Sequence, residues 1–216
     1  QFKQAMPYPP VGTLYAMAYL REQGFEVKLF DTMFCQSPTD INATIDEFKP
    51  DVFISYDDGF NYLTKMCLTN MREACFKMQQ YAKSKGCMVI TSSSDATDHA
   101  EDYLRHGSDA VTIGEAEQTV LDLCLAFKSN QSINSISGIA FYNNSVFEKT
   151  TSRAIIKDLD TLPHPAWDLI DIIPYKQVWI KHHGYFSLNF VTTRGCPYKC
   201  NWCAKPIYGN RYNSHS

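Results

Sequence analysis

The chain has 216 residues, a formal net charge of −3 at pH 7, and 44% hydrophobic and 20% charged residues. These values are typical of a soluble globular chain of one or two domains, and they give no basic footprint for nucleic-acid binding. No run approaches the roughly 18 apolar residues of a membrane span. The first residues lack both an initiator Met and a signal-peptide core. We therefore expect a fragment of a cytoplasmic protein with mostly reduced cysteines.

Strands and helices alternate along the first 128 residues. Helical spacing of apolar residues predicts a helix over 11–24, and a strand over 26–30 follows it. The later predicted elements, in chain order, are a helix at 39–48, a strand at 51–56, a long helix whose apolar stripe spans 63–82, a strand at 87–91, a helix at 97–106, a strand at 109–113 and a helix at 115–128.

This alternation predicts an α/β fold, namely a doubly wound, mostly parallel, Rossmann-like sheet with helices on both faces. Because the first predicted element is a helix, we expect the strand that should precede it to be missing. Ligands of such sheets bind beyond the carboxyl ends of the strands. The loops that matter are therefore 7–12, 31–38, 55–61, 91–97 and 112–117.

The remaining residues predict a smaller, less regular part. The stretches GIAFY and SVFEK flank Asn143-Asn144, which predicts a hairpin with a two-residue turn. Residues 151–185 contain three prolines and predict an irregular connector, and YFSLNFVTT at 185–193 predicts a strand. We accordingly divide the chain into a sheet domain, a hairpin with its connector, and a last domain that is truncated: 1–128, 129–184 and 185–216.

Three cysteines follow the last predicted strand: Cys196, Cys200 and Cys203, in a C-x3-C-x2-C pattern. Thiolates bind soft metals, and three thiolates on a four-iron cluster leave one iron open to coordinate a substrate. Structural zinc takes four ligands, so a Cys3His zinc site with His215 is an alternative. Cys67, Cys75, Cys87 and Cys124 fall on predicted helices and strands, where we expect core packing.

The segment 192–206, TTRGCPYKCNWCAKP, resembles the signature of the radical S-adenosylmethionine (SAM) superfamily, C-x3-C-x-aromatic-C after a strand. The resemblance implies a 4Fe–4S cluster on the three cysteines, with SAM on the open iron and Trp202 packed near the adenine. It also implies that 185–216 holds the first strand of a truncated radical SAM partial (β/α) barrel. A core role is the alternative for Trp202. The implied reaction is reductive cleavage of SAM to methionine and a 5′-deoxyadenosyl radical, which abstracts hydrogen from a substrate. The implied partners are a small-molecule or natural-product substrate and an electron donor such as flavodoxin or ferredoxin.

The stretches PPVGTLYAMAYLREQGFEVKLFD, DVFISY and DAVTIGEAE resemble the cobalamin-binding domain of one subgroup of that superfamily. The resemblance implies cobalamin contacts from Gly12, Ser55, Ser92, Ser93, Ser94, Gly114, Glu115 and Glu117. Carrier proteins ligate cobalt with a His three positions before this Gly, where this chain has Pro9, and they have glycines where it has the serine run. The Gly114 turn also fits ordinary roles, because glycine frees the backbone and glutamates suit the first turn of a helix.

The two resemblances together imply a cobalamin-dependent radical SAM enzyme, with methyl transfer to an unreactive carbon as the favoured subtype and ring closure or rearrangement as alternatives. The competing interpretation is a non-catalytic corrinoid-binding module with the zinc site. Asp57-Asp58 resembles part of a phospho-receiver domain, but that domain's Lys is absent, since Gly114-Glu115 stands there. A shared metal on His182-His183 is disfavoured, because adjacent strand residues point to opposite faces.

Overall fold

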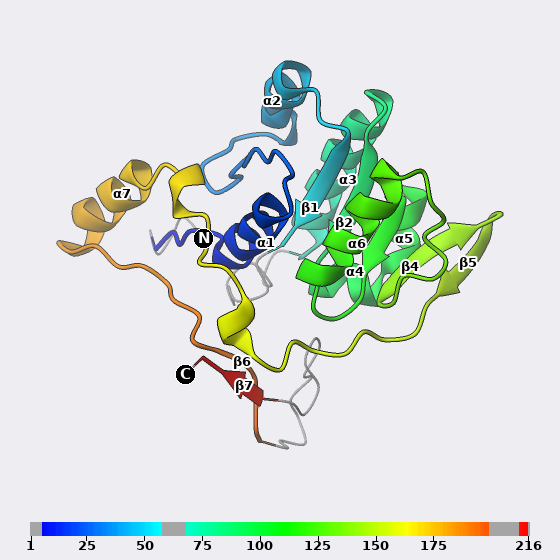
Figure 1. Ribbon diagram of the computed structural model, residues 1–216. Helices are drawn as coiled ribbons and strands as arrows, with labels where there is room; N and C mark the ends of the chain where they lie inside the picture. The colour runs from blue at the N-terminus through cyan, green and yellow to red at the C-terminus, as the bar shows by residue number, and fades with distance from the viewer. Residues whose placement is uncertain (1–5, 58–67, 199–211, 216) are drawn as a thin grey trace.

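Figure 1 shows the computed structural model, which describes residues 6–57, 68–198 and 212–215. A five-stranded sheet forms the middle of three layers. Helices α1 (Val11–Glu22) and α6 (Glu117–Lys128) cover one face, where Leu20, Leu121 and Leu123 pack against strand residues. The helices α2 (Ile41–Phe48), α3 (Leu68–Ser84), α4 (Ser94–Asp98) and α5 (Ala100–Arg105) pack on the other face.

The sheet has the order β1-β2-β3-β4-β5. The first three strands, β1 (Val52–Tyr56), β2 (Met88–Ser92) and β3 (Ala110–Thr112), run parallel. Strands β4 (Ile139–Asn143) and β5 (Val146–Lys149) add an antiparallel hairpin on β3. The predicted fold class, an α/β sheet with helices on both faces, is confirmed.

Two predicted strands are wrong. Residues 26–30 form no strand, although Val27 and Leu29 pack beside α1 and Phe30 packs beside α2. Of residues 185–193, only Thr193 is in a strand, β6 (Thr193–Gly195), which pairs with β7 (Tyr212–Ser214). Both stretches have strand-like composition, but a strand also needs a neighbouring backbone to pair with. Among the described residues, 26–30 have no such partner, and 185–193 have one only at their end, where Thr192 and Thr193 lie beside β7 and His215.

Two elements differ from their predicted bounds, and residues within each element explain the difference. The helix predicted at 97–106 begins earlier, because the Ser93 hydroxyl accepts a hydrogen bond from the Ala96 amide at 2.8 Å and caps α4. His99 then separates α4 from α5. The hairpin turn is Asn144-Ser145, one residue later than predicted, because these two residues adopt positive φ while Asn143 pairs with Val146.

The connector is more regular than predicted. It contains helix α7 (Ile173–His183) and two 3-10 turns at Leu159–Thr161 and Trp167–Leu169. Pro174, one of the three prolines of the expected irregular connector, occupies the first turn of α7, where proline is favoured. His182 and His183 therefore lie in the last turn of a helix and not on a strand. Across the described part of the chain, no helix is both long and apolar enough to cross a membrane.

Candidate functional site

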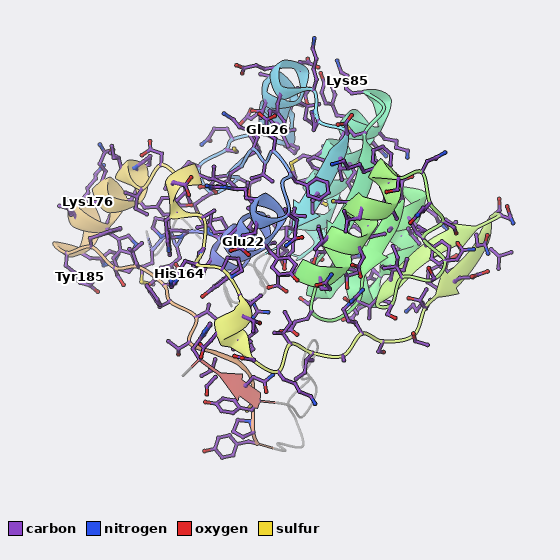
Figure 2. All side chains as sticks on the ribbon, in the orientation of Figure 1. Glu22, Glu26, Lys85, His164, Lys176 and Tyr185 are labelled. Carbon is purple, nitrogen blue, oxygen red and sulfur yellow. The ribbon has the colours of Figure 1, made fainter. Side chains whose placement is uncertain are left out.

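The carboxyl ends of β1, β2 and β3 form one edge of the sheet, at the bottom of Figure 1, and the β6–β7 hairpin lies on that side. Lys85 follows α3 at the opposite edge, as Figure 2 shows. The chain segment that leads into the three cysteines is therefore on the side where ligands of parallel sheets bind.

The amino end of α1 meets the end of β1. The Thr13 hydroxyl donates to the Tyr56 carbonyl oxygen at 3.3 Å, and the neighbouring Gly12 is buried. The helix that follows the predicted loop 7–12 thus contacts the described part of the predicted loop 55–61. Ser55 points to the other face, since its hydroxyl lies 3.0 Å from the Cys75 thiol on α3. Burial raises the pKa of Cys75 to about 11, so this thiol stays protonated at neutral pH.

The serine run lies at the same edge. Ser92 is buried at the end of β2, and its carbonyl oxygen accepts a hydrogen bond from the Asp57 amide at 2.8 Å. Ser93 caps α4, and Ser94 is the first residue of that helix. The run therefore serves the fold as a strand end and a helix cap, while Ser93 and Ser94 keep part of their surface exposed.

A buried ion pair holds this run in place. Asp95 accepts two hydrogen bonds from the Arg72 guanidinium, at 2.7 and 2.6 Å, and one from the Tyr103 hydroxyl at 2.8 Å. Burial opposes ionisation of Asp95, but the bonds from Arg72 and Tyr103 outweigh it and hold the pKa of this carboxyl below its ordinary value.

We expect Asp95→Asn to lower the free energy of unfolding by about 2–4 kcal/mol at pH 7, because it leaves the Arg72 charge unpaired. A depressed pKa stabilises the fold above the unfolded-state pKa, and this stability is lost as the pH falls through the folded-state pKa. The loss caused by the variant, measured by urea unfolding, should therefore shrink below about pH 4. Asp168→Asn is the control, since its pair with Arg21 is exposed and should contribute about 1 kcal/mol or less. A loss of equal size at pH 7 and pH 3 would contradict this account.

Thr112 is a residue that the sequence did not single out. It ends β3, is 2% exposed, and its hydroxyl has no hydrogen-bond partner among the described residues. The two-residue period of a strand places it on the same face as Ala110, which packs in the core shared with α1 and α6. Two residues later, Gly114 has a φ of +89°, and a Cβ added there would meet no atom within 4 Å. An unsatisfied buried hydroxyl is uncommon in native proteins and calls for an explanation.

The turn after Gly114 is bound to the strand before the cysteines. Arg194 donates from Nη1 to Glu115 Oε1 at 2.8 Å and from Nη2 to Glu117 Oε1 at 2.6 Å. The Arg194 side chain is 3% exposed, and the two carboxylate side chains are 5% and 4% exposed. The two glutamates predicted at the cobalamin site thus direct these carboxylate oxygens toward Arg194, a residue that the sequence analysis did not identify.

The cysteine motif begins two residues after Arg194. Cys196 is a partly buried free thiol, whereas Cys200, Trp202 and Cys203 lie outside the described residues. His215, the alternative zinc ligand, has Nδ1 at 2.9 Å from Asp160 Oδ1. The described residues contain no group of three or more His, Cys, Asp or Glu side chains that could hold a metal ion.

Comparison with curated proteins gives two relatives. The chain is 27% identical over 214 residues to an uncharacterized methyltransferase of Pyrococcus horikoshii and 24% identical over 209 residues to an anaerobic magnesium-protoporphyrin IX monomethyl ester cyclase of Synechocystis. These matches cover 96% and 94% of this chain, but it spans only 43% and 39% of the relatives. No family model matches the chain.

Two solved structures have a similar fold. OxsB, a cobalamin-dependent SAM radical enzyme with aqua-cobalamin and SAM bound, matches with a TM-score of 0.73 and 19% identity, over 100% of this chain and 28% of that one. TsrM from Kitasatospora setae, a radical SAM methyltransferase with cobalamin and a [4Fe-4S] cluster bound, matches with a TM-score of 0.69 and 15% identity, over 97% of this chain and 42% of that one. At these identities the matches establish the fold.

Proposed function

We propose that this chain carries the cobalamin-binding sheet and the cluster-binding loop of a cobalamin-dependent radical SAM enzyme. The observation that carries the proposal is the link through Arg194, which joins the start of the C-x3-C-x2-C motif to the Gly114 turn at the carboxyl edge of the sheet. The similarity to OxsB and TsrM supports the same combination of parts.

The residues at the sheet edge fit a corrinoid. The Thr112 hydroxyl is buried and finds no hydrogen-bond partner in residues 6–57, 68–198 and 212–215, and a corrinoid offers amide groups that could bond to it. Gly114 borders open space, Gly12 lies at the start of α1, and Ser92 ends the neighbouring strand. We propose that Thr112, Ser92, Ser93, Ser94, Gly12 and Gly114 line the corrinoid site, with Ser55 behind them on the α3 side.

The cysteine motif fits a 4Fe–4S cluster by its donor set, because three thiolates leave one iron for SAM. When bound, the 4Fe–4S cluster would supply the cleavage of SAM, and the corrinoid would carry a methyl group. Cys196, Cys200 and Cys203 would hold the cluster and Trp202 would orient the adenine. Methyl transfer is the favoured reaction, since one curated relative and TsrM are methyltransferases; the second curated relative is a cyclase, which makes ring closure the alternative. A small-molecule substrate, a flavodoxin- or ferredoxin-like electron donor and a cytoplasmic location belong to the same proposal.

Electron paramagnetic resonance (EPR) of the anaerobically reconstituted and reduced protein tests this function. We expect a brown protein whose reduced-cluster signal changes when SAM is added, because SAM would coordinate the open iron. A colourless protein that retains zinc would instead support the corrinoid-binding module with a Cys3His site. A cluster signal that SAM leaves unchanged would contradict the radical SAM assignment.

Thr112→Val should weaken the binding of hydroxocobalamin by about three- to tenfold, because it removes one hydrogen-bonding group of the site. The same change should leave the free energy of unfolding nearly unchanged, since the hydroxyl has no partner in the protein part that the structure describes. Equilibrium titration of the corrinoid and urea unfolding measure the two effects.

Thr91→Val is the matched control, since Thr91 is equally buried but its hydroxyl lies 2.6 Å from the Ser108 hydroxyl. This variant should lose about 1–2 kcal/mol of stability and keep its corrinoid affinity. The opposite pattern, with weaker binding in Thr91→Val only, would place the corrinoid elsewhere.

A further inference from the structure

Arg194 lies where the two proposed cofactor-binding parts meet. It belongs to the short strand β6, two residues before Cys196, and its partners Glu115 and Glu117 flank the start of α6. The guanidinium also lies over the Tyr15 ring of α1, 5.8 Å from the ring centroid. One side chain therefore contacts both α1 and the start of α6, the two helices that cover one face of the sheet.

The same group of ion-paired side chains also contacts the connector. Glu115 Oε2 accepts a hydrogen bond from the Ile156 amide at 2.5 Å, and the Ile156 carbonyl oxygen accepts one from the Asn213 side chain at 2.6 Å. Because Asn213 pairs with Arg194 across the β6–β7 ladder, both strands of this hairpin are tied to Glu115. The hairpin strands are only three residues each, so side-chain contacts of this kind determine its orientation on the sheet edge.

We propose that Arg194 is a positioning residue, whose ion pairs with Glu115 and Glu117 fix the start of the cysteine loop at the carboxyl edge of the sheet. The fixed start sets the separation between a cluster on the loop and a corrinoid at the edge; the identity of those two groups rests on the proposed function. The guanidinium suits this role because its planar fork meets two acceptors in one orientation. Glu115 and Glu117 act through Arg194 in this assignment.

The burial of Arg194, Glu115 and Glu117 favours one orientation of the Arg194 side chain. All three charged side chains are at most 5% exposed, so removing the guanidinium would leave two buried carboxylates without its positive charge. Gly195, between Arg194 and Cys196, has a φ of +80°, a conformation that glycine adopts without strain. The backbone therefore turns immediately after the anchored residue and before the first cysteine.

The first test needs no cofactor. We expect Arg194→Gln to increase amide hydrogen exchange at residues 193–198 by about tenfold or more in the apo protein, because the local opening of this strand becomes easier. The matched control is Arg153→Gln. Arg153 lies on the connector, and its guanidinium donates to Thr119 at 2.8 Å and pairs with Asp122, two residues of the same helix α6. Arg153→Gln should leave exchange at 193–198 unchanged. If Arg194→Gln does not fold, Glu117→Gln gives a milder version of the same increase.

The second test distinguishes positioning from stability alone. In protein loaded with iron, sulfide and hydroxocobalamin and then reduced, pulsed EPR measures the separation between cobalt and the cluster. We expect one narrow distance in the parent and a broadened distribution in Arg194→Gln or Glu117→Gln at unchanged iron and cobalt content. Unchanged exchange, or an equally narrow distance in the variant, would overturn the proposal. A parent that binds neither metal would contradict the proposed function, while the exchange measurement would still decide whether Arg194 anchors the loop.

Discussion

Replacing Cys196, Cys200 or Cys203 by Ala is expected to abolish iron incorporation during anaerobic reconstitution. A 4Fe–4S cluster bound through three thiolates has no spare protein ligand, so loss of any one thiolate leaves two and the cluster should not assemble stably. Iron and sulfide analysis after gel filtration measures the effect for each variant separately. The three variants should lose iron equally, because each cysteine holds one iron of the same cluster.

Cys124→Ala is the matched control for these variants. Cys124 is 3% exposed on α6, and burial raises the pKa of its thiol to about 11, so it is a packed, protonated core residue. Its replacement should leave iron content unchanged and cost about 1 kcal/mol of stability through a small cavity. Equal iron loss in Cys124→Ala and in the motif variants would show that the motif does not hold the cluster.

Cobalamin bound at the sheet edge should have no protein imidazole on cobalt. The position that supplies the His in carrier proteins is Pro9, which is buried and whose carbonyl oxygen accepts a hydrogen bond from the Asn189 side chain at 3.0 Å. Proline offers no side-chain donor to a metal. The lower face of cobalt should therefore carry water or no ligand, which would make cobalt easier to reduce in the reaction that we propose.

EPR of the cobalt(II) form measures this ligand, because a coordinating nitrogen splits each cobalt line into three. We expect lines without that splitting. His99 lies between α4 and α5 with its side chain 46% exposed, and His164 lies on the connector, as Figure 2 shows. A threefold splitting that disappears in His99→Ala or His164→Ala would show that the corrinoid site is misplaced.

The helices of the first 128 residues and the parallel strands could be predicted because their signals are local, whereas α7 was not predicted. The apolar stripe of α3 has the spacing of a helix, and the short apolar runs of β1 to β3 are typical of buried strands. Each of these patterns can be recognised within one segment of the chain. The strand predictions at 26–30 and 185–193 were wrong because they used only the local composition of each segment. A strand depends on a partner that is distant in sequence, and composition alone does not provide it.

The candidate site was predictable in place but not in detail. The rule for parallel sheets placed Gly12, Ser92 and Gly114 at one edge, and the structure agrees that they are there. The direction of the glutamate side chains was not predictable, because Arg194 lies 79 and 77 residues away from Glu115 and Glu117. Thr112 was missed because its distinguishing feature, a buried hydroxyl to which no other described residue bonds, exists only in three dimensions.

The most direct test of the account is the metal content of one gel-filtration peak after anaerobic reconstitution with iron, sulfide and hydroxocobalamin. We expect about four iron atoms and one cobalt atom to travel with each chain, with Cys200→Ala removing the iron and Thr112→Val lowering only the cobalt. Protein that elutes with zinc and without either iron or corrinoid would contradict it.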